Sequence, residues 1–157
     1  MVEKRKRKIL ILTTFYPPSA GGIQTYTYEI AKNLKKLGMD VTVFVISSNG
    51  IKKFFSANSL KVYRDRKKAP LTEIFHRFDF ILASSWFPAG IVGVFLSRLH
   101  QSKLFISAHG NELLYPRKYL GMRFLMKWCF KKTDKIFAVS KYTKLSLIHI
   151  SEPTRLG

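Results

Sequence analysis

The sequence has one cysteine, few acidic residues and no apolar run long enough to cross a membrane. Cys129 cannot form a disulfide within the chain, and its neighbours Trp128 and Phe130 predict a buried thiol in a reducing compartment. Residues 80–96 carry no charge, but this run is shorter than a membrane span and contains proline and glycine. We therefore expect a strand, a loop and a helix there.

Acidic residues are scarce: nine Asp and Glu stand against 28 Lys and Arg, which gives a formal net charge of +19 at pH 7. A charge of this size indicates an anionic partner, and nucleic acid, anionic lipid and phosphorylated substrates all remain open. No helix-turn-helix, RNP or zinc-finger pattern accompanies the charge. Nucleic-acid binding is therefore the weakest of the functional alternatives, and no cluster of metal ligands predicts a metal site.

Apolar runs of strand length alternate with helical patterns along the 157 residues. This alternation predicts an α/β fold with right-handed crossovers and a doubly wound parallel sheet. We expect strands at residues 9–12, 40–46, 60–63, 80–83, 103–108 and 135–139. We expect helices at residues 23–37, 71–78, 89–99 and 117–132.

The segment Phe-Tyr-Pro-Pro-Ser-Ala-Gly-Gly-Ile-Gln, residues 15–24, joins the first expected strand to the first helix. A helix start attracts phosphate through its free N–H groups, and Gly21 and Gly22 leave the approach unobstructed. The spacings of a dinucleotide fingerprint and of a P-loop are both missing, and a plain turn explains a glycine pair equally well. Gly38 is expected to end the helix, whose apolar face consists of Ile23, Thr27, Ile30, Leu34 and Leu37.

Several polar residues follow expected strands, at the edge where doubly wound sheets bind ligands. His109 follows the strand at 103–108, and its imidazole can donate to oxygens that gain negative charge, although a structural role is the alternative. Asn111 and Glu112 either orient substrate hydroxyls or cap the next turn. Ser140 is expected to cap a helix.

Three motifs together resemble the amino-terminal domain of family four glycosyltransferases, which are retaining, two-domain enzymes of the GT-B type. These motifs are the glycine segment at 15–24, His-Gly-Asn-Glu-Leu-Leu at 109–114 and Thr-Asp-Lys-Ile-Phe-Ala-Val-Ser-Lys-Tyr at 133–142. The resemblance covers residues 8–144. It implies a Rossmann-like domain, the amino-terminal half of a GT-B enzyme, and a nucleotide-sugar donor bound between two domains without a cofactor or metal ion.

The resemblance also implies roles for individual residues. Gly21 and Gly22 would bind the donor diphosphate through their amides, and His109 would be the catalytic contact to the transferring sugar. The acceptor side would be formed by Tyr16 and Gln24, with Asn111 and Glu112 as further candidates. Many family members have Glu where this chain has Gln24, which weakens the acceptor assignment there.

The resemblance divides the chain into a basic tail at 1–7, the domain at 8–144 and a segment at 145–157. The last segment, which contains Leu-Ser-Leu-Ile-His-Ile-Ser-Glu-Pro-Thr-Arg, resembles a translated transposase sequencing adapter and is expected to be non-native. The donor-binding domain of a GT-B enzyme would then be absent. We expect this truncated glycosyltransferase to be inactive alone, and a noncatalytic Rossmann-like binding domain is the alternative.

Basic residues recur every four positions in the helix expected at 117–132. Arg123, Lys127 and Lys131 form one stripe beside apolar residues, which is typical of a helix lying on anionic lipid. A solvated basic face is the alternative reading. The stripe favours a cytoplasmic protein, peripheral at the inner face of the membrane, with a lipid-linked or cell-envelope acceptor.

Overall fold

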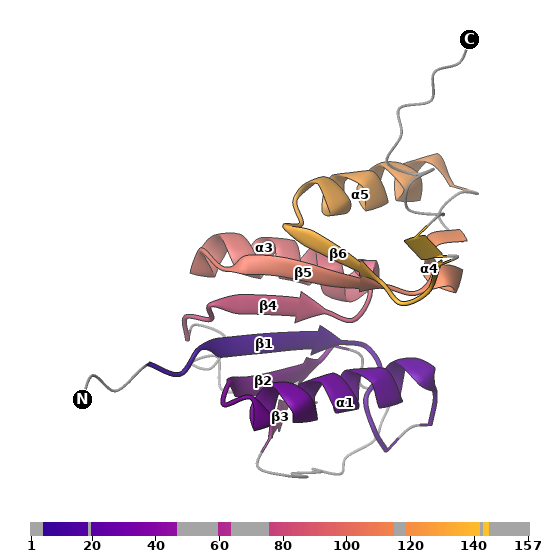
Figure 1. Cartoon of the computed structure of the whole chain (residues 1–157). Coiled ribbons are helices and arrows are strands. Elements are labelled where there is room, and N and C mark those ends of the chain that lie inside the picture. Colours follow the sequence, from indigo (N-terminus) through magenta and orange to yellow (C-terminus); the bar gives the residue numbers. More distant parts are fainter. Residues whose placement is uncertain are drawn as a thin grey trace.

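The computed structural model describes residues 5–18, 20–46, 60–63, 76–114, 119–141 and 143–144. These residues form one six-stranded sheet in the order β3-β2-β1-β4-β5-β6 (Figure 1). All neighbouring strands are parallel, so the predicted parallel α/β sheet is confirmed. The elements are β1 (Lys8–Thr13), α1 (Gly22–Lys36), β2 (Asp40–Val45), β3 (Lys61–Tyr63), β4 (Phe80–Ala83), η1 (Trp86–Gly90), α3 (Ile91–His100), β5 (Lys103–Ala108), α4 (Gly110–Leu114), α5 (Leu120–Lys131) and β6 (Lys135–Ala138).

The strand order reverses at β1, which pairs with β2 on one side and with β4 on the other. The chain therefore moves outward from β1 to β3, and later outward from β4 to β6. The loops that follow β1 and β4 diverge at this point, and such a reversal leaves a crevice at the carboxyl edge of a parallel sheet. The glycine loop lies at this crevice.

The two faces of the sheet carry separate cores. Along β1, Leu10 and Leu12 pack into one cluster with residues of α3 and α5, whereas Ile9 and Ile11 pack into another with residues of α1. This alternation follows from the two-residue period of a strand. Among the described elements, α3 and α5 thus cover one face, and α1 covers part of the opposite face (Figure 1).

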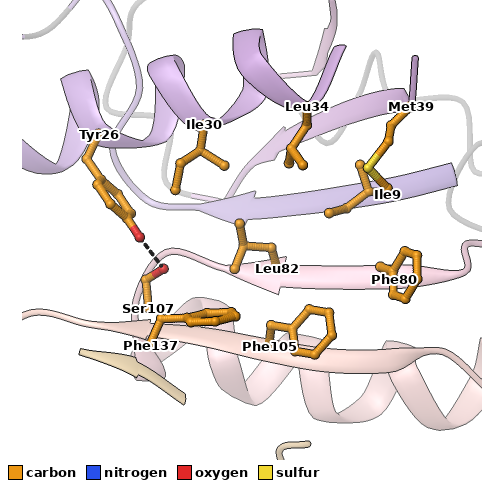
Figure 2. Close-up of a pocket in the computed structure, with 10 residues that line it drawn as sticks. All are labelled: Ile9, Tyr26, Ile30, Leu34, Met39, Phe80, Leu82, Phe105, Ser107 and Phe137. Atoms are coloured by element: carbon orange, nitrogen blue, oxygen red, sulfur yellow. Dashed lines mark hydrogen bonds between the residues drawn. The ribbon is translucent and has the colours of Figure 1, made fainter. Parts of the chain in front are cut away.

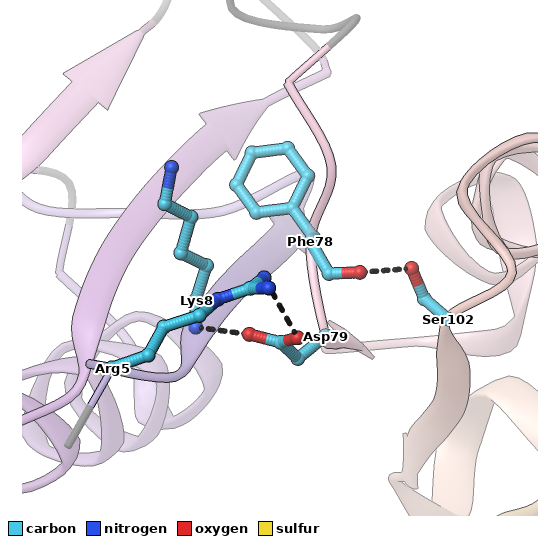
Figure 3. Close-up of polar contacts among 5 residues, drawn as sticks. All are labelled: Arg5, Lys8, Phe78, Asp79 and Ser102. Carbon is cyan, nitrogen blue, oxygen red and sulfur yellow. Dashed lines mark hydrogen bonds and ion pairs between the residues drawn. The ribbon is translucent and has the colours of Figure 1, made fainter. Parts of the chain in front are cut away.

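Polar side chains tie the amino ends of the strands together (Figure 3). The Lys8 amide at the start of β1 donates to Asp79 Oδ2 over 2.8 Å, and Arg5 forms an ion pair with the same carboxylate at 3.3 Å. The Asp134 carboxylate accepts the Leu104 amide over 2.7 Å in the same way. These charge-assisted bonds pair backbone groups that would otherwise be left open where the strands begin.

Some expected helix boundaries are wrong. α1 ends at Lys36, and Leu37 is 79% exposed, so the apolar face ends at Leu34 rather than at Leu37 as predicted. Phe87 has an extended backbone, as the residue before a proline prefers. Residues 89 and 90 belong to η1, and α3 begins at Ile91. α5 begins at Leu120. Most of the helix expected at 71–78 lies outside the described residues, and residues 76–78 are not helical.

In the part of the chain that the structure describes, no helix is both long and apolar enough to span a bilayer.

Candidate functional site

Buried hydroxyl groups join the loops after β1 and β4 at the carboxyl edge. The Ser84 hydroxyl donates to Thr13 Oγ1 over 2.7 Å, and Thr13 Oγ1 donates to the Phe15 carbonyl over 2.8 Å. Both hydroxyl groups belong to buried residues, so their mutual pairing satisfies groups that would be costly to bury alone. The start of the glycine loop is thereby held against the end of β4.

The two glycines of this loop differ in what requires them. Gly21 has a φ of 155°, a conformation that side-chain-bearing residues rarely adopt, and the Gln24 amide folds over the place where its Cβ would lie. Gly22 has nothing within 4 Å of the position of a Cβ. No contact within the described chain therefore demands glycine at position 22, and the space beside it is open.

Among the residues that the structure describes, no side chain caps or neutralises the start of α1. Its cap residue, Gly21, has no side chain that could accept a hydrogen bond from the helix amides, and the first turn contains no acidic residue. The Gly21 carbonyl accepts the Thr25 amide over 3.1 Å and the Thr25 hydroxyl over 3.0 Å, so the helix begins firmly at this point. A 15-residue helix that begins this way presents free N–H groups and a partial positive charge to the crevice.

His109 lies directly after β5 at the same edge. Its Nε2 atom is buried and has no hydrogen-bond partner within the described chain. Burial lowers the pKa of the imidazole, and a hydrogen bond with the backbone of Ser84 opposes that effect. The lowered pKa favours the neutral form of the ring, and one buried nitrogen of this ring has no partner among the described residues.

Glu112 holds the backbone beside this histidine. Its Oε1 atom accepts the His109 amide over 3.0 Å, and its own carbonyl accepts the Trp86 indole N–H over 3.0 Å. Burial raises the pKa of the carboxyl group to about 7, against the smaller opposing effect of the backbone hydrogen bonds from His109 and Trp86. Glu112 thus makes the capping contact that was the alternative to a substrate contact.

Tyr26 connects α1 to His109, and the sequence patterns did not single it out. Its ring meets the imidazole edge to face, with centroids 5.4 Å apart and planes at 88°. Its hydroxyl bonds to the Ser107 hydroxyl on β5 over 3.1 Å. Tyr26 stands one helical turn after Gly22, and Ser107 two residues before His109, so both residues lie close to the two converging loops.

An apolar pocket of about 530 Å³ extends from this pair along the sheet (Figure 2). Tyr26 and Ser107 stand at one end, and three phenylalanines from β4, β5 and β6 continue the lining: Phe80, Phe105 and Phe137. The Phe80 and Phe105 rings stack at 5.9 Å. With only these two hydroxyl groups, the pocket does not provide the donors that phosphates and sugar hydroxyls need. The carboxyl edge of the sheet, with the open space at Gly22 and the unpaired Nε2 of His109, is the better candidate for a polar ligand.

Comparison with known proteins assigns the chain to a family. A profile of Glycosyltransferase Family 4 matches residues 20–155. The chain belongs to glycosyltransferase family 4. Two uncharacterized glycosyltransferases of Methanocaldococcus jannaschii are each 26% identical to it, over 88% and 89% of this chain and 42% and 43% of their own lengths. The chain thus spans about two-fifths of these relatives.

A crystal structure of S. aureus homoserine dehydrogenase also aligns, at 12% identity over 85% of this chain and 32% of that chain, with a TM-score of 0.43. This likeness is too low to support an argument about function.

The acceptor-side candidates of this family 4 domain do not share one setting. Tyr16 is 4% exposed and packs edge to face against Tyr28 at 6.2 Å, so it lies in the core on the α1 side. Gln24 is half-buried and folds over Gly21. Asn111 belongs to α4, but its side chain is outside what the structure describes. The acceptor roles of these residues remain predictions.

Two structural expectations are confirmed. The Ser140 hydroxyl accepts the Thr143 amide over 3.1 Å, which makes it the cap of the following helical turn. Cys129 is fully buried, and burial raises the pKa of its thiol to about 12, so it remains a protonated packing group.

Within the described ranges, no three His, Cys, Asp or Glu residues are grouped as metal ligands would be.

Proposed function

We propose that this family 4 domain holds a nucleotide-sugar donor at the carboxyl edge of its sheet. The observation that carries the proposal is the pairing of an uncapped helix start with a buried histidine whose Nε2 lacks a partner. Tyr26 of α1 touches the His109 ring, so the two features belong to one site. A diphosphate would satisfy the α1 amides, and the adjoining sugar would reach Nε2.

The proposed reaction is retaining sugar transfer. The bond between the anomeric carbon and the diphosphate oxygen breaks, and the acceptor oxygen forms the new bond on the same face of the sugar. The acceptor proton passes to the departing diphosphate. The amides at Gly21 and Gly22 would stabilise the charge that grows on the leaving group, and His109 would position the sugar.

The acceptor and the location form a further part of the proposal. A net charge of +19 suits a phosphorylated, lipid-linked or cell-envelope acceptor, and a cytoplasmic protein at the inner face of a membrane. Because the relatives are more than twice as long, we also propose that the rest of a longer protein completes the donor site. The 157-residue chain alone should then give no measurable turnover.

A transfer assay on the full-length protein, with a panel of nucleotide sugars, tests this function. We expect His109→Ala to lower kcat/KM about a hundredfold or more, because it removes a contact to the transferring sugar. His76→Ala is the matched control, since His76 is exposed and stands before β4 at the opposite edge. Equal activities of the two variants would contradict the role of His109, and donor binding without transfer would favour a noncatalytic domain. NMR of the product tests retention.

A further inference from the structure

Large apolar side chains are exposed on the outer side of α3 and α5. Phe95 and Leu99 on α3 are 62% and 60% exposed, and Leu120 and Phe124 on α5 are 76% and 73% exposed. Phe95 also contacts Trp128 of α5, with ring centroids 6.2 Å apart. The four-residue spacing on each helix and the Phe95–Trp128 contact between the helices connect these residues into one patch, here called the α3–α5 surface.

The charges on this surface have one sign. Neither helix contains an acidic residue, whereas basic residues accompany the apolar ones: Arg98 on α3 and Arg123, Lys127 and Lys131 on α5. Asp134 is the next acidic residue after α5, and its carboxylate accepts the Leu104 amide at the start of β5. Within the described ranges, no carboxylate of α3 or α5 offsets the positive field.

We propose that the α3–α5 surface docks on an anionic lipid bilayer. Exposed apolar area of this kind is costly in water and marks an interaction surface. Aromatic and leucine side chains beside lysine and arginine are the composition of helices that lie in the headgroup region of a membrane. Nucleic acid would use the charges and the aromatic rings, but it offers no counterpart for Leu99 and Leu120.

The α3–α5 surface reaches the edge of the sheet at which we propose that the donor binds. α5 connects β5 to β6, so it begins at the carboxyl edge, where Tyr119 is 59% exposed. Phe87, which follows β4 at this edge, is 48% exposed. A bilayer on the α3–α5 surface would therefore approach the edge that carries His109. The link to a membrane-borne acceptor rests on the proposed sugar transfer, whereas lipid binding itself does not.

Vesicle flotation without any donor tests the charge half of the proposal. Vesicles of phosphatidylcholine are compared with an equimolar mixture of phosphatidylcholine and phosphatidylglycerol, and only the mixture should carry the protein. A triple variant of α5 should weaken that binding about tenfold or more: Arg123→Gln, Lys127→Gln, Lys131→Gln. The matched control removes the same charge from α1, on the opposite face, and should bind nearly as well as the wild type: Lys32→Gln, Lys35→Gln, Lys36→Gln.

The apolar half has its own matched pair and its own probe. Leu120→Ser should weaken binding severalfold, whereas Leu37→Ser on the α1 side should not, although the two leucines are 76% and 79% exposed. Brominated lipid should quench Trp128 on the surface, and Trp128→Phe should abolish the quenching because Trp86 is only 2% exposed. Thermal melts of each variant check that the fold is kept.

Three results would overturn the proposal: equal recovery with neutral and anionic vesicles, equal losses in the two triple variants, or no quenching of Trp128. Binding of an oligonucleotide or of a second copy through α5, with vesicle binding unchanged, would also overturn it. Sugar transfer without vesicle binding would remove this inference alone. Vesicle binding by a protein that transfers no sugar would remove the proposed function alone.

Discussion

The two edges of the sheet differ in whether their polar groups have hydrogen-bond partners. At the amino edge, Asp79 and Asp134 bind strand amides at 2.8 Å and 2.7 Å, and the Ser102 hydroxyl donates to the Phe78 carbonyl at 2.6 Å (Figure 3). At the carboxyl edge, the start of α1 has no side-chain cap and the buried Nε2 of His109 has no partner in the described chain.

This difference teaches how one fold separates stability from binding. Groups that are fully paired contribute to folding and offer nothing to a ligand. Groups that are buried and unpaired reduce stability until a ligand satisfies them, which is why they indicate a site. Substitutions at the two edges should therefore have effects of different kinds.

The largest effect on donor affinity is expected from Gly22→Asp. The new carboxylate would occupy the open space at the start of α1, where it would repel a donor diphosphate and weaken donor affinity about a hundredfold. The same carboxylate interacts favourably with the helix start, so the free energy of unfolding should rise by up to about 1 kcal/mol. Gly22→Ala is the control for the added side chain. Donor titration and urea unfolding measure the two signs, and unchanged affinity would show that no diphosphate binds there.

At the other edge, Asp79→Ala should lower the free energy of unfolding by about 2 kcal/mol, because the Lys8 amide loses a charged acceptor. Arg5→Ala should cost less than about 0.5 kcal/mol, since its ion pair with Asp79 is exposed. Donor affinity, measured on the folded fraction, should be unchanged in both. A large loss of donor affinity in Asp79→Ala would contradict the claim that the amino edge affects stability and not donor binding.

Glu112 should make stability depend on pH at the carboxyl edge. Its pKa is raised from an ordinary 4.5 to about 7, so the folded state binds its proton more tightly than the unfolded state. This tighter proton binding raises the free energy of unfolding. The contribution is fully present below pH 4.5 and is lost as the pH rises to about 7. His109 contributes the opposite slope, because its pKa is lowered.

The variant Glu112→Gln isolates the first of these slopes. The wild type loses free energy of unfolding between pH 5 and pH 8 through this carboxyl group, and the variant does not. The difference between variant and wild type should therefore shift in favour of the variant by on the order of 1 kcal/mol over this range. Urea unfolding at the two pH values measures the difference. Parallel pH profiles of the two proteins would mean that the carboxyl group of Glu112 titrates normally.

A modest effect is expected at Ser140, which lies at the carboxyl edge but stabilises the fold. Ser140→Ala should lower the free energy of unfolding by about 1 kcal/mol through loss of the cap on the Thr143 amide, and Ser140→Asp should restore it. Neither change should alter donor affinity. Weaker donor binding by Ser140→Asp alone would extend the anion site to this residue.

The sequence predicted the sheet well because strand periodicity and buried apolar runs are local signals. The strand at 103–108 was expected at the residues where β5 lies, and Gly38, with a φ of 85°, ends α1 as expected. Helix ends were predicted less well, because they depend on local backbone geometry such as the extended Phe87 before Pro88. The position of Leu37 outside the core also depends on where α1 ends.

The sequence predicted that the candidate site residues lie at the carboxyl edge of the sheet, but it predicted only part of their contacts. His109 and the glycine loop meet at one edge because parallel strands bring their carboxyl ends together, and the order of elements already implies this. The contact of Tyr26 with His109 depends on the rotation of α1 about its axis, which no motif encodes. Tyr16 stands three residues after the end of β1 and turns into the core, a direction that the motif alone does not determine.

Amide chemical shifts during a titration with nucleotide-sugar donors test the central claim most directly. If the donor binds where we propose, the resonances of Gly21, Gly22 and His109 should move together, even with weak binding by the 157-residue chain. The Lys8 and Leu104 amides at the amino edge should stay fixed. Shifts at the amino edge, or none at the glycine loop under donor saturation of a full-length protein, would contradict the account.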